Sequence, residues 1–248
     1  MGMRVEVFTF CWNEMDILPF AVDYWQKYAS HVTVFDNGST DGSIQYLQAQ
    51  GDRITVGHME TGGEINDTIL LNMKNDSWKQ ARGRADMIVV CDMDEMLCAP
   101  DIIRSLNTMR RVGGTICKPL WYDLVSDETP VWSGLPLHQI RPLAAKTFGK
   151  AILFDPNAID EINYTPGAHD CNPTGDVRWF AGDIYTLHAN HNLSFEHKVS
   201  RYRLMASRLS EMNIRLQHGV HYAFSEDVLR EGWESDRRRA INFGAIIG

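Results

Sequence analysis

The sequence lacks the features that mark membrane-spanning, disulfide-rich secreted and zinc-binding proteins. No apolar run approaches the roughly 18 residues that a membrane-spanning helix needs, and the N-terminal residues MGMRVE contain no hydrophobic signal region. The 5 cysteines are odd in number and include no C-x-x-C pair, which argues for free thiols rather than a disulfide framework or a zinc site. We therefore expect a cytoplasmic protein without a transmembrane segment.

The sequence also lacks an excess of positive charge. It has 24 lysine and arginine residues against 32 aspartate and glutamate residues, for a formal net charge of −8. Nucleic acids and anionic membranes are bound by basic surfaces, so we expect neither as a partner. The 248 residues, 44% of them hydrophobic, are enough to bury a core without disulfides. A homo-oligomer is compatible with the sequence.

Strand and helix patterns alternate through the first half of the chain. Segments rich in β-branched and aromatic residues predict strands at residues 4–11, 31–36, 53–57 and 86–91. Helices are expected at residues 16–28, 43–50, 66–82 and 100–112, with Asp16 capping the first of them. Such alternation predicts an α/β fold with a mainly parallel, Rossmann-like sheet flanked by helices.

The second half of the chain is less regular. Strands are expected at residues 114–120, 137–141, 151–154 and 183–188. Apolar residues three and four positions apart predict an amphipathic helix at 195–216, and a further helix is expected at 224–239. We expect residues 1–194 to form one domain and residues 195–248 to form a helical extension packed on it.

Polar clusters follow three of the predicted strands, namely Asn13-Glu14, Asp36-Asn37 and Asp92–Glu95. In parallel sheets ligands bind outside the carboxyl ends of the strands, so we expect these clusters to converge in one crevice. Asp92 and Asp94 come directly after an apolar strand, where two carboxylates can hold a hard divalent cation together with substrate phosphates. The alternative is a solvated acidic loop that caps the next helix.

Three segments that carry these clusters resemble the motifs of a known family. The segments CWNEMDILPFAVDYW, VFDNGSTDGS and VVCDMDEML occur in order, and they resemble glycosyltransferase family 2 and the subgroup related to family 92. The likeness is good over residues 4–100 and continues in patches beyond them. It implies a GT-A fold and metal-dependent, inverting transfer of a sugar from a nucleotide-diphosphate sugar to a glycan or other hydroxyl acceptor. Uridine is the default donor base, with guanosine and thymidine open.

The resemblance also implies roles for individual residues. The donor nucleotide would be bound by Asn13, Glu14, Asp36, Asn37 and Asp92. The metal, Mn²⁺ or Mg²⁺, would be held by Asp92, Asp94 and His169, with His188 as the alternative nitrogen ligand. In this division Asp92 faces the nucleotide and Asp94 binds the metal directly. Either histidine could instead be a structural residue held by hydrogen bonds.

The catalytic base is the least determined part of the predicted site. An inverting transferase needs a carboxylate or a histidine within hydrogen-bond reach of the acceptor hydroxyl. Asp123, Asp127 and Glu128 lie in the expected acceptor-side region, and Asp127 is our first candidate. Glu95 is the second, and we expect it either to approach the acceptor or to cap the next helix.

Two other classes of function compete with glycosyl transfer. A sugar nucleotidyltransferase would usually carry a glycine-rich loop after the first strand to bind a triphosphate, and the loop Trp12–Met15 contains no glycine. A non-catalytic nucleotide- or sugar-binding module would have little need of the complete Asp92/Asp94 pair. The segment from Arg208 to Tyr222 could cover the active site, contact a second subunit or simply end a helix at a glycine turn.

Overall fold

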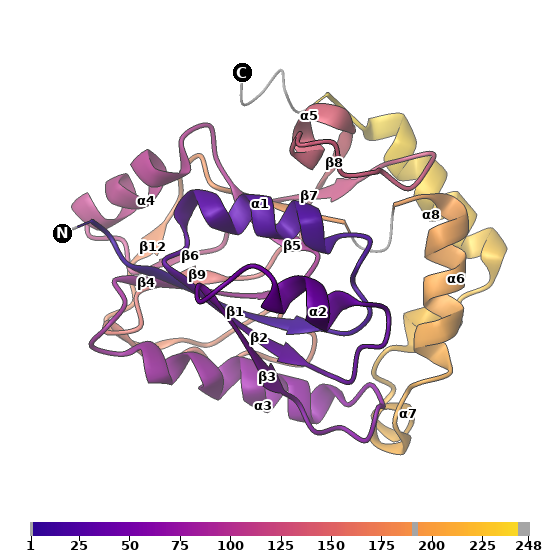
Figure 1. Ribbon diagram of the computed structural model, residues 1–248, viewed down its shortest axis with the longest axis horizontal. Helices are drawn as coiled ribbons and strands as arrows, with labels where there is room; N and C mark the ends of the chain where they lie inside the picture. The colour runs from indigo at the N-terminus through magenta and orange to yellow at the C-terminus, as the bar shows by residue number, and fades with distance from the viewer. Residues whose placement is uncertain (1, 190–192, 243–248) are drawn as a thin grey trace.

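The first half of the chain builds the parallel part of the central sheet. The computed structural model describes residues 2–189 and 193–242. Its first four strands, β1 (Val5–Cys11), β2 (His31–Asp36), β3 (Ile54–His58) and β4 (Met87–Asp92), pair in parallel in the order β3-β2-β1-β4 (Figure 1). Every residue of β1 is buried, as expected for a strand covered on both faces.

Three short strands from the second half complete this sheet. They are β6 (Ile116–Cys117), β9 (Leu153–Phe154) and β12 (Trp179–Phe180), which give the order β12-β6-β9-β4-β1-β2-β3. Strand β9 is antiparallel to both of its neighbours, and the other pairings are parallel. The predicted α/β class with a mainly parallel sheet is therefore confirmed.

A second sheet stands beside the first. It has the order β5-β13-β7-β8 and consists of β5 (Glu95–Cys98), β13 (Tyr185–His188), β7 (Leu120–Leu124) and β8 (Leu143–Lys146). Strand β5 follows β4 after a turn of two residues and was not predicted from the sequence. A small antiparallel pair, β10 (Ile159–Glu161) with β11 (Thr174–Gly175), lies apart from both sheets in the pairing pattern. Because β5 and β13 pair antiparallel, His188 lies opposite Glu95.

Helices cover both faces of the central sheet. In Figure 1, α1 (Leu18–Tyr28) and α4 (Ile102–Arg111) lie on one side, and α3 (Asp67–Asp76) lies on the other. The short helices α2 (Ser43–Gln48) and η1 (Ser77–Ala81) pack on opposite faces as well. Successive strand residues point to opposite faces, so Val7 belongs to the hydrophobic core under α1, whereas Phe8 belongs to the core under η1.

The C-terminal helices form a third hydrophobic cluster. They are α6 (Phe195–Ala206), α7 (Glu211–Leu216), η2 (Val220–Ala223) and α8 (Glu226–Arg239). Their cluster consists of Phe195, Val199, Tyr202, Leu229 and Trp233. Helices α6 and α7 stand beside the carboxyl ends of β1 and β2 (Figure 1), and α8 packs against α6 and β8. The division at residue 195 into a domain and an extension stays a prediction.

Two predictions about the second half are wrong in secondary structure. Residues 137–141, predicted as a strand, form the helical turn α5 (Leu137–Ile140). Arg141 is extended because a residue before proline avoids the helical region, so Pro142 limits the turn. The predicted helix 195–216 is divided into α6 and α7 by a backbone bridge between Ile65 and Leu209.

The start of α1 also differs from the prediction. Asp16 does not cap this helix, whose N-cap is Ile17 and has no side-chain hydrogen bond. Asp16 instead lies 3.4 Å from the Nε2 atom of His197 in α6. The first backbone N–H of α1, that of Leu18, instead donates to the carbonyl oxygen of Glu14 at 3.0 Å, and Pro19 needs no hydrogen-bond acceptor.

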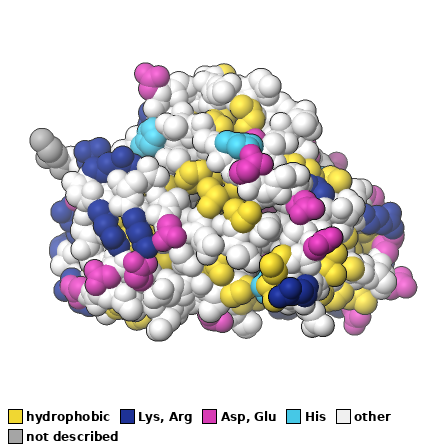
Figure 2. All heavy atoms as spheres, turned by 90° about the horizontal axis from the view of Figure 1, so that it is seen from below, with side chains coloured by type: hydrophobic (Ala, Val, Ile, Leu, Met, Phe, Trp, Pro, Cys, Tyr) yellow, Lys and Arg dark blue, Asp and Glu magenta, His cyan; other side chains and the backbone are white. Residues whose placement is uncertain are grey.

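The surface of the described part of the chain is mixed in charge. On the face shown in Figure 2, acidic and basic side chains are interspersed, and hydrophobic side chains gather near the centre. Within residues 2–189 and 193–242, every helix is too short or too polar to cross a lipid bilayer. The five cysteines are all free thiols.

Candidate functional site

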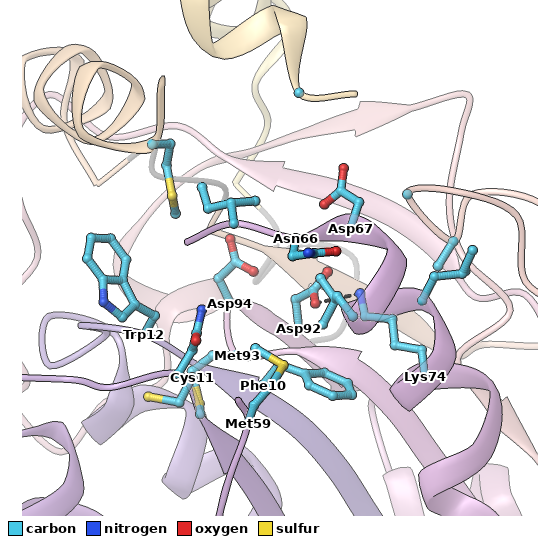
Figure 3. Close-up of a pocket in the computed structure, with 18 of the residues that line it drawn as sticks. Phe10, Cys11, Trp12, Met59, Asn66, Asp67, Lys74, Asp92, Met93 and Asp94 are labelled. Atoms are coloured by element: carbon cyan, nitrogen blue, oxygen red, sulfur yellow. Dashed lines mark ion pairs between the residues drawn. The ribbon is translucent and has the colours of Figure 1, made fainter. Parts of the chain in front are cut away.

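A cavity of about 300 Å³ opens at the carboxyl ends of the parallel strands. Its floor contains Phe10 and Met59, and its polar wall contains Glu14 after β1, Asn37 after β2, and Asp92 and Asp94 after β4. Figure 3 shows Trp12, Asp92 and Asp94 around this space. The crevice lies where crossover connections in a parallel sheet leave room for a ligand. One or two members of each predicted polar cluster thus line a single cavity.

Other elements close the cavity from the side and from above. Helix α3 contributes Asp67 and Lys74, and the loop before β11 contributes His169. The turn between α6 and α7 contributes Arg208, and η2 contributes Tyr222. The segment between these last two residues therefore covers part of the cavity, which agrees with one of the three interpretations of its sequence.

Asp92 is held between two lysines. Its Oδ1 atom lies 2.6 Å from Nζ of Lys74, and its Oδ2 atom lies 2.7 Å from Nζ of Lys150. Figure 3 shows Lys74 reaching from α3 to this carboxylate. Burial by itself would raise the pKa of Asp92, but Lys150 and Lys74 hold that pKa well below its usual range. Asp92 is therefore ionised and paired with two ammonium groups, one of which, Lys150, also pairs with Glu95.

Glu95 is buried at the start of β5, with 1% of its surface exposed. Its carboxylate pairs with Lys150 and accepts a hydrogen bond of 3.1 Å from the backbone N–H of Asp92. Burial raises the pKa of Glu95, and Lys150 opposes that shift. Glu95 does not cap the following helix, since Asp101 caps α4 by accepting from the N–H of Arg104 at 2.9 Å. The capping alternative for Glu95 is therefore wrong.

Asp94, Glu95 and His188 form a group with metal-ligand chemistry. One oxygen or nitrogen atom of each lies within 4.8 Å of the others. The Nε2 atom of His188 lies 3.6 Å from Oδ2 of Asp94, and its Nδ1 atom lies 2.9 Å from Oδ1 of Asp123. A histidine whose other nitrogen is fixed by a carboxylate is the usual form of a metal-binding histidine. The donor set of one imidazole and one or two carboxylates fits Mn²⁺ or Mg²⁺.

The pKa of His188 reflects these carboxylates. Burial by itself would lower it, but Asp94 and the hydrogen bond to Asp123 raise the pKa above its ordinary value. Asp123 responds in the opposite direction, since His188 and Lys146 lower its pKa against the effect of burial. The electrostatic field around His188 is therefore negative, which favours a cation at this position.

His169, the first histidine predicted as a metal ligand, lies elsewhere in the cavity wall. It follows Gly167 and Ala168, whose φ angles are 81° and 59°, and its ring meets that of Phe148 edge-on at 5.5 Å. Burial, and then the nearby Lys150, lower its pKa to about 4. His169 is therefore a neutral imidazole at neutral pH, and its role as a ligand stays a prediction.

Asn13 and Asp36, predicted to bind the nucleotide, brace the loop after β2 in this structure. The Asp36 carboxylate accepts from the backbone N–H groups of Gly38 and Ser39 at 2.9 and 3.0 Å. The Oδ1 atom of Asn13 accepts from the N–H of Thr40 at 2.7 Å. Neither residue is among those that line the cavity, and their proposed contacts with a nucleotide remain predictions.

The sequence analysis missed a pair of arginines that hold Trp12 and Glu14. Arg201 of α6 is buried, pairs with Glu14 and donates to the carbonyl oxygens of Trp12 and Asn13 at 2.8 and 2.9 Å. The guanidinium of Arg208 lies 3.2 Å from the centroid of the Trp12 ring. No local motif around Arg201 points to this role, because the contact joins residues almost 190 positions apart.

The buried lysines were missed for the same reason. Lys74 lies on a predicted helix face, and Lys150 opens the apolar run Ala151–Phe154. A lysine beside a buried strand is an unusual placement, and this was the available signal for Lys150. By contrast Asp127, our first candidate for the base, is exposed, pairs with Arg237 at 3.0 Å and is not among the cavity-lining residues.

Comparisons with known proteins add a distant similarity. No protein-family model and no curated protein matches the chain. Among solved structures, S. aureus TarS is 12% identical, with 83% of this chain and 39% of that chain covered and a TM-score of 0.41. The S. aureus TarS 1-349 structure in complex with UDP-GlcNAc is 11% identical, with 83% and 66% covered and a TM-score of 0.41.

A second similarity is to glucosyl-3-phosphoglycerate synthase from Mycobacterium tuberculosis, in complex with Mn²⁺, uridine diphosphate and glucosyl-3-phosphoglycerate. It is 19% identical, with 48% of this chain and 44% of that chain covered and a TM-score of 0.32. The chain thus spans less than half the length of these two proteins, TarS and the synthase.

Proposed function

We propose that this chain is a glycosyltransferase of the GT-A fold, which moves a sugar from a nucleotide-diphosphate sugar to an acceptor hydroxyl. The observation that carries the proposal is the cavity in which Asp92 and Asp94 meet Glu14 and Asn37 at the ends of three parallel strands. These residues come from the three segments that resemble family 2. A volume of about 300 Å³ is at the lower end of the range of small-molecule sites, roughly 300–1,000 Å³.

The donor nucleotide would lie against Asn37 and Glu14, and the diphosphate would lie toward the Asp92 side. The lysines at Asp92 support this placement, because they supply two positive charges next to a carboxylate that would otherwise repel phosphate. Asn13 and Asp36 would contribute by fixing the loop that carries Asn37. Uridine diphosphate remains the default donor nucleotide.

Asp94 would hold the divalent cation together with His188. The distance of 3.6 Å between Asp94 Oδ2 and His188 Nε2 supports this pair, and Asp123 would orient the imidazole through its Nδ1 atom. Asp92 would act mainly on the nucleotide side, and His169 is the alternative nitrogen ligand. When bound, the cation supplies Lewis-acid stabilisation of the negative charge on the leaving diphosphate.

The acceptor side of the reaction is less supported. The resemblance favours inversion, which requires a base next to the acceptor hydroxyl. Glu95 is engaged by Lys150, and Asp127 is engaged by Arg237 outside the cavity lining. Neither position supports the role of base, which stays a prediction for both residues.

The proposed function is tested by donor cleavage with and without a chelator. We expect the full chain to release uridine diphosphate from a UDP-sugar in the presence of Mn²⁺, and we expect EDTA to abolish the release. In a thermal-shift panel, the correct nucleoside diphosphate at about 100 times its Kd should stabilise the protein by about 2.7 kcal/mol. Activity that persists in EDTA would contradict the metal requirement.

Two outcomes would favour the competing functions. Pyrophosphate release from a nucleoside triphosphate and a sugar phosphate would identify a nucleotidyltransferase. Tight binding of a nucleoside diphosphate, with no donor cleavage by water or by any of a broad panel of sugars, would identify a non-catalytic binding module.

A further inference from the structure

A series of buried charges connects α8 with the cavity. It begins at Asp236, whose two carboxylate oxygens both lie 2.7 Å from Nζ of Lys146 in β8. Lys146 also lies 3.3 Å from Oδ2 of Asp123 in β7. The other oxygen of Asp123 contacts Nδ1 of His188 at 2.9 Å. The last step is the approach of His188 to Asp94, so the series ends in the proposed metal site.

These groups are shielded from water along the whole series. The exposed fractions of the side chains are 9% for Asp236, 15% for Lys146, 3% for Asp123 and 15% for His188. Exposed ion pairs contribute little because water screens them, whereas the loss of one partner from a buried pair is costly. A change of charge at Asp236 should therefore alter the electrostatic environment of His188.

Lys146 is shared between the carboxylates of Asp236 and Asp123, and the Asp123 oxygen that faces His188 also accepts from Nε1 of Trp121 at 2.9 Å. With Asp236 present, the ammonium group of Lys146 interacts mainly with the Asp236 carboxylate on α8. Without Asp236, the ammonium would pair with Asp123 alone and draw negative charge away from the oxygen that faces Nδ1. The Nδ1–H bond to Asp123 would weaken, and His188 would become a poorer metal ligand at Nε2.

The attachment of α8 does not depend on Asp236 alone. Helix α8 is also attached through Leu229 and Trp233, which pack in a hydrophobic cluster with Phe195. Asp236 receives a further contact of 2.7 Å from Arg239 on the same helix. A carboxylate needed only to attach α8 would not have to reach the lysine that contacts Asp123.

We infer that Asp236 is a positioning residue for the proposed metal site, acting through Lys146 and Asp123 on His188. The inference rests on the proposed function, since it concerns the same site. Helix α8 would then influence the active site through Asp236. None of the described residues of α8 lines the cavity itself.

The test measures binding of Mn²⁺ alone to the full chain by titration calorimetry, before any donor is added. Loss of a direct partner of a metal-binding histidine costs about 10- to 100-fold in affinity. Because Asp236 acts two contacts further away, we expect Asp236→Asn to weaken Mn²⁺ binding by about 3- to 10-fold. Asp236→Glu should restore most of it. The control is Glu234→Gln on the same helix, an exposed residue 3.9 Å from Arg238, which should change nothing.

A second variant separates positioning from damage to the fold. Lys146→Met combined with Asp236→Asn removes both charges and leaves Asp123 with its contacts to His188 and Trp121, so Mn²⁺ affinity should return to within about twofold of the unmodified chain. Nitrogen-15 shifts of the His188 ring should show less Nδ1–H tautomer in Asp236→Asn and a normal amount in the double variant. A double variant that binds Mn²⁺ as weakly as Asp236→Asn would overturn the inference.

The outcomes also distinguish this inference from the proposed function. If the unmodified chain cleaves a UDP-sugar and binds Mn²⁺, but Asp236→Asn binds Mn²⁺ equally well, then only the role of Asp236 is refuted. If the unmodified chain binds no Mn²⁺, the proposed metal site fails and the role of Asp236 fails with it. Donor binding in EDTA should be the same in all variants, because neither Asn37 nor Glu14 contacts Asp236, Lys146 or Asp123.

Discussion

Asp92 and Asp94 are separated by one residue, yet the structure puts them in opposite electrostatic surroundings. The carboxylate of Asp92 meets Lys74 and Lys150, whereas that of Asp94 faces His188 and lies beside Glu95. Met93 between them is buried in the hydrophobic core. A D-x-D sequence therefore describes two different groups, a carboxylate paired with two lysines on one side of the cavity and a carboxylate that faces a histidine on the other.

The difference explains why the spacing of a motif does not by itself determine which of its carboxylates has which role. Two identical side chains two positions apart are equivalent in the sequence. Their roles are set by residues that come from other elements, such as Lys74 of α3 and His188 of β13. The variants below test whether the two sides behave as differently as their surroundings suggest.

The largest expected effect is on turnover and comes from Asp94. We expect Asp94→Ala to lower donor cleavage at saturating Mn²⁺ by about 10³-fold, because it removes a proposed direct ligand to the ion that would stabilise the leaving diphosphate. The affinity for uridine diphosphate should lose its dependence on Mn²⁺ in this variant. Both are measured by a coupled nucleotide-release assay and by calorimetry. An Asp94→Ala variant that is fully active at low Mn²⁺ would contradict the assignment.

The next effect is on stability and separates the two aspartates directly. We expect Asp92→Asn to lower the free energy of unfolding by about 2–3 kcal/mol, because it leaves the buried Lys74 without its carboxylate partner. Asp94→Asn should change it by less than about 1 kcal/mol, since that site holds several groups of like charge. Urea unfolding measures both. Equal losses of unfolding free energy in the two variants would show that the lysines do not make Asp92 more important for stability than Asp94.

A matched lysine pair provides the control for this comparison. Lys74→Met should reproduce much of the loss seen in Asp92→Asn, since either variant breaks the same buried contact. Lys79→Met breaks pairs with Asp76 and Glu161 that are far more exposed, and it should cost less than about 1 kcal/mol.

The parts of the fold that could be predicted from the sequence are those determined by local pattern. The run His31–Asp36 was predicted with its observed ends, because a short segment rich in β-branched and aromatic residues favours a strand. Helix α3 begins one residue after Asn66, as its capping side chain indicates. The convergence of polar residues in one cavity also followed from a general rule about parallel sheets.

The parts that could not be predicted depend on contacts between distant segments. Nothing near Leu209 indicates that it bridges to Ile65 and interrupts a helix. Lys150 and Arg201 complete the site from segments that carry no recognisable motif. The choice between His169 and His188 likewise depends on which loop approaches Asp94, and a single sequence does not contain that information.

The smallest expected effect concerns these two histidines, whose pKa values move in opposite directions. His169 lies on the lysine side, where burial and then Lys150 lower its pKa to about 4. His188 lies on the other side, where Asp94 and Asp123 raise its pKa despite burial. In an NMR titration of the metal-free chain, we expect His169 to stay neutral until the pH approaches about 4. We expect His188 to keep its proton above pH 6.5.

The two shifts also predict opposite effects of pH on stability. Because the folded pKa of His169 is lower than its ordinary value of 6.5, the unfolded chain takes up the proton more readily. The contribution of this residue is therefore present above pH 6.5 and is lost as the pH falls toward about 4. The folded pKa of His188 is raised, so its contribution is present below pH 6.5 and is lost as the pH rises through the folded value.

His169→Asn should flatten the dependence of unfolding free energy on pH between about 4 and 6.5, whereas His188→Asn should flatten it above 6.5. If both variants altered the same pH range, the lysine and histidine sides of the cavity would not carry opposite fields, and the division between Asp92 and Asp94 would lose its electrostatic basis.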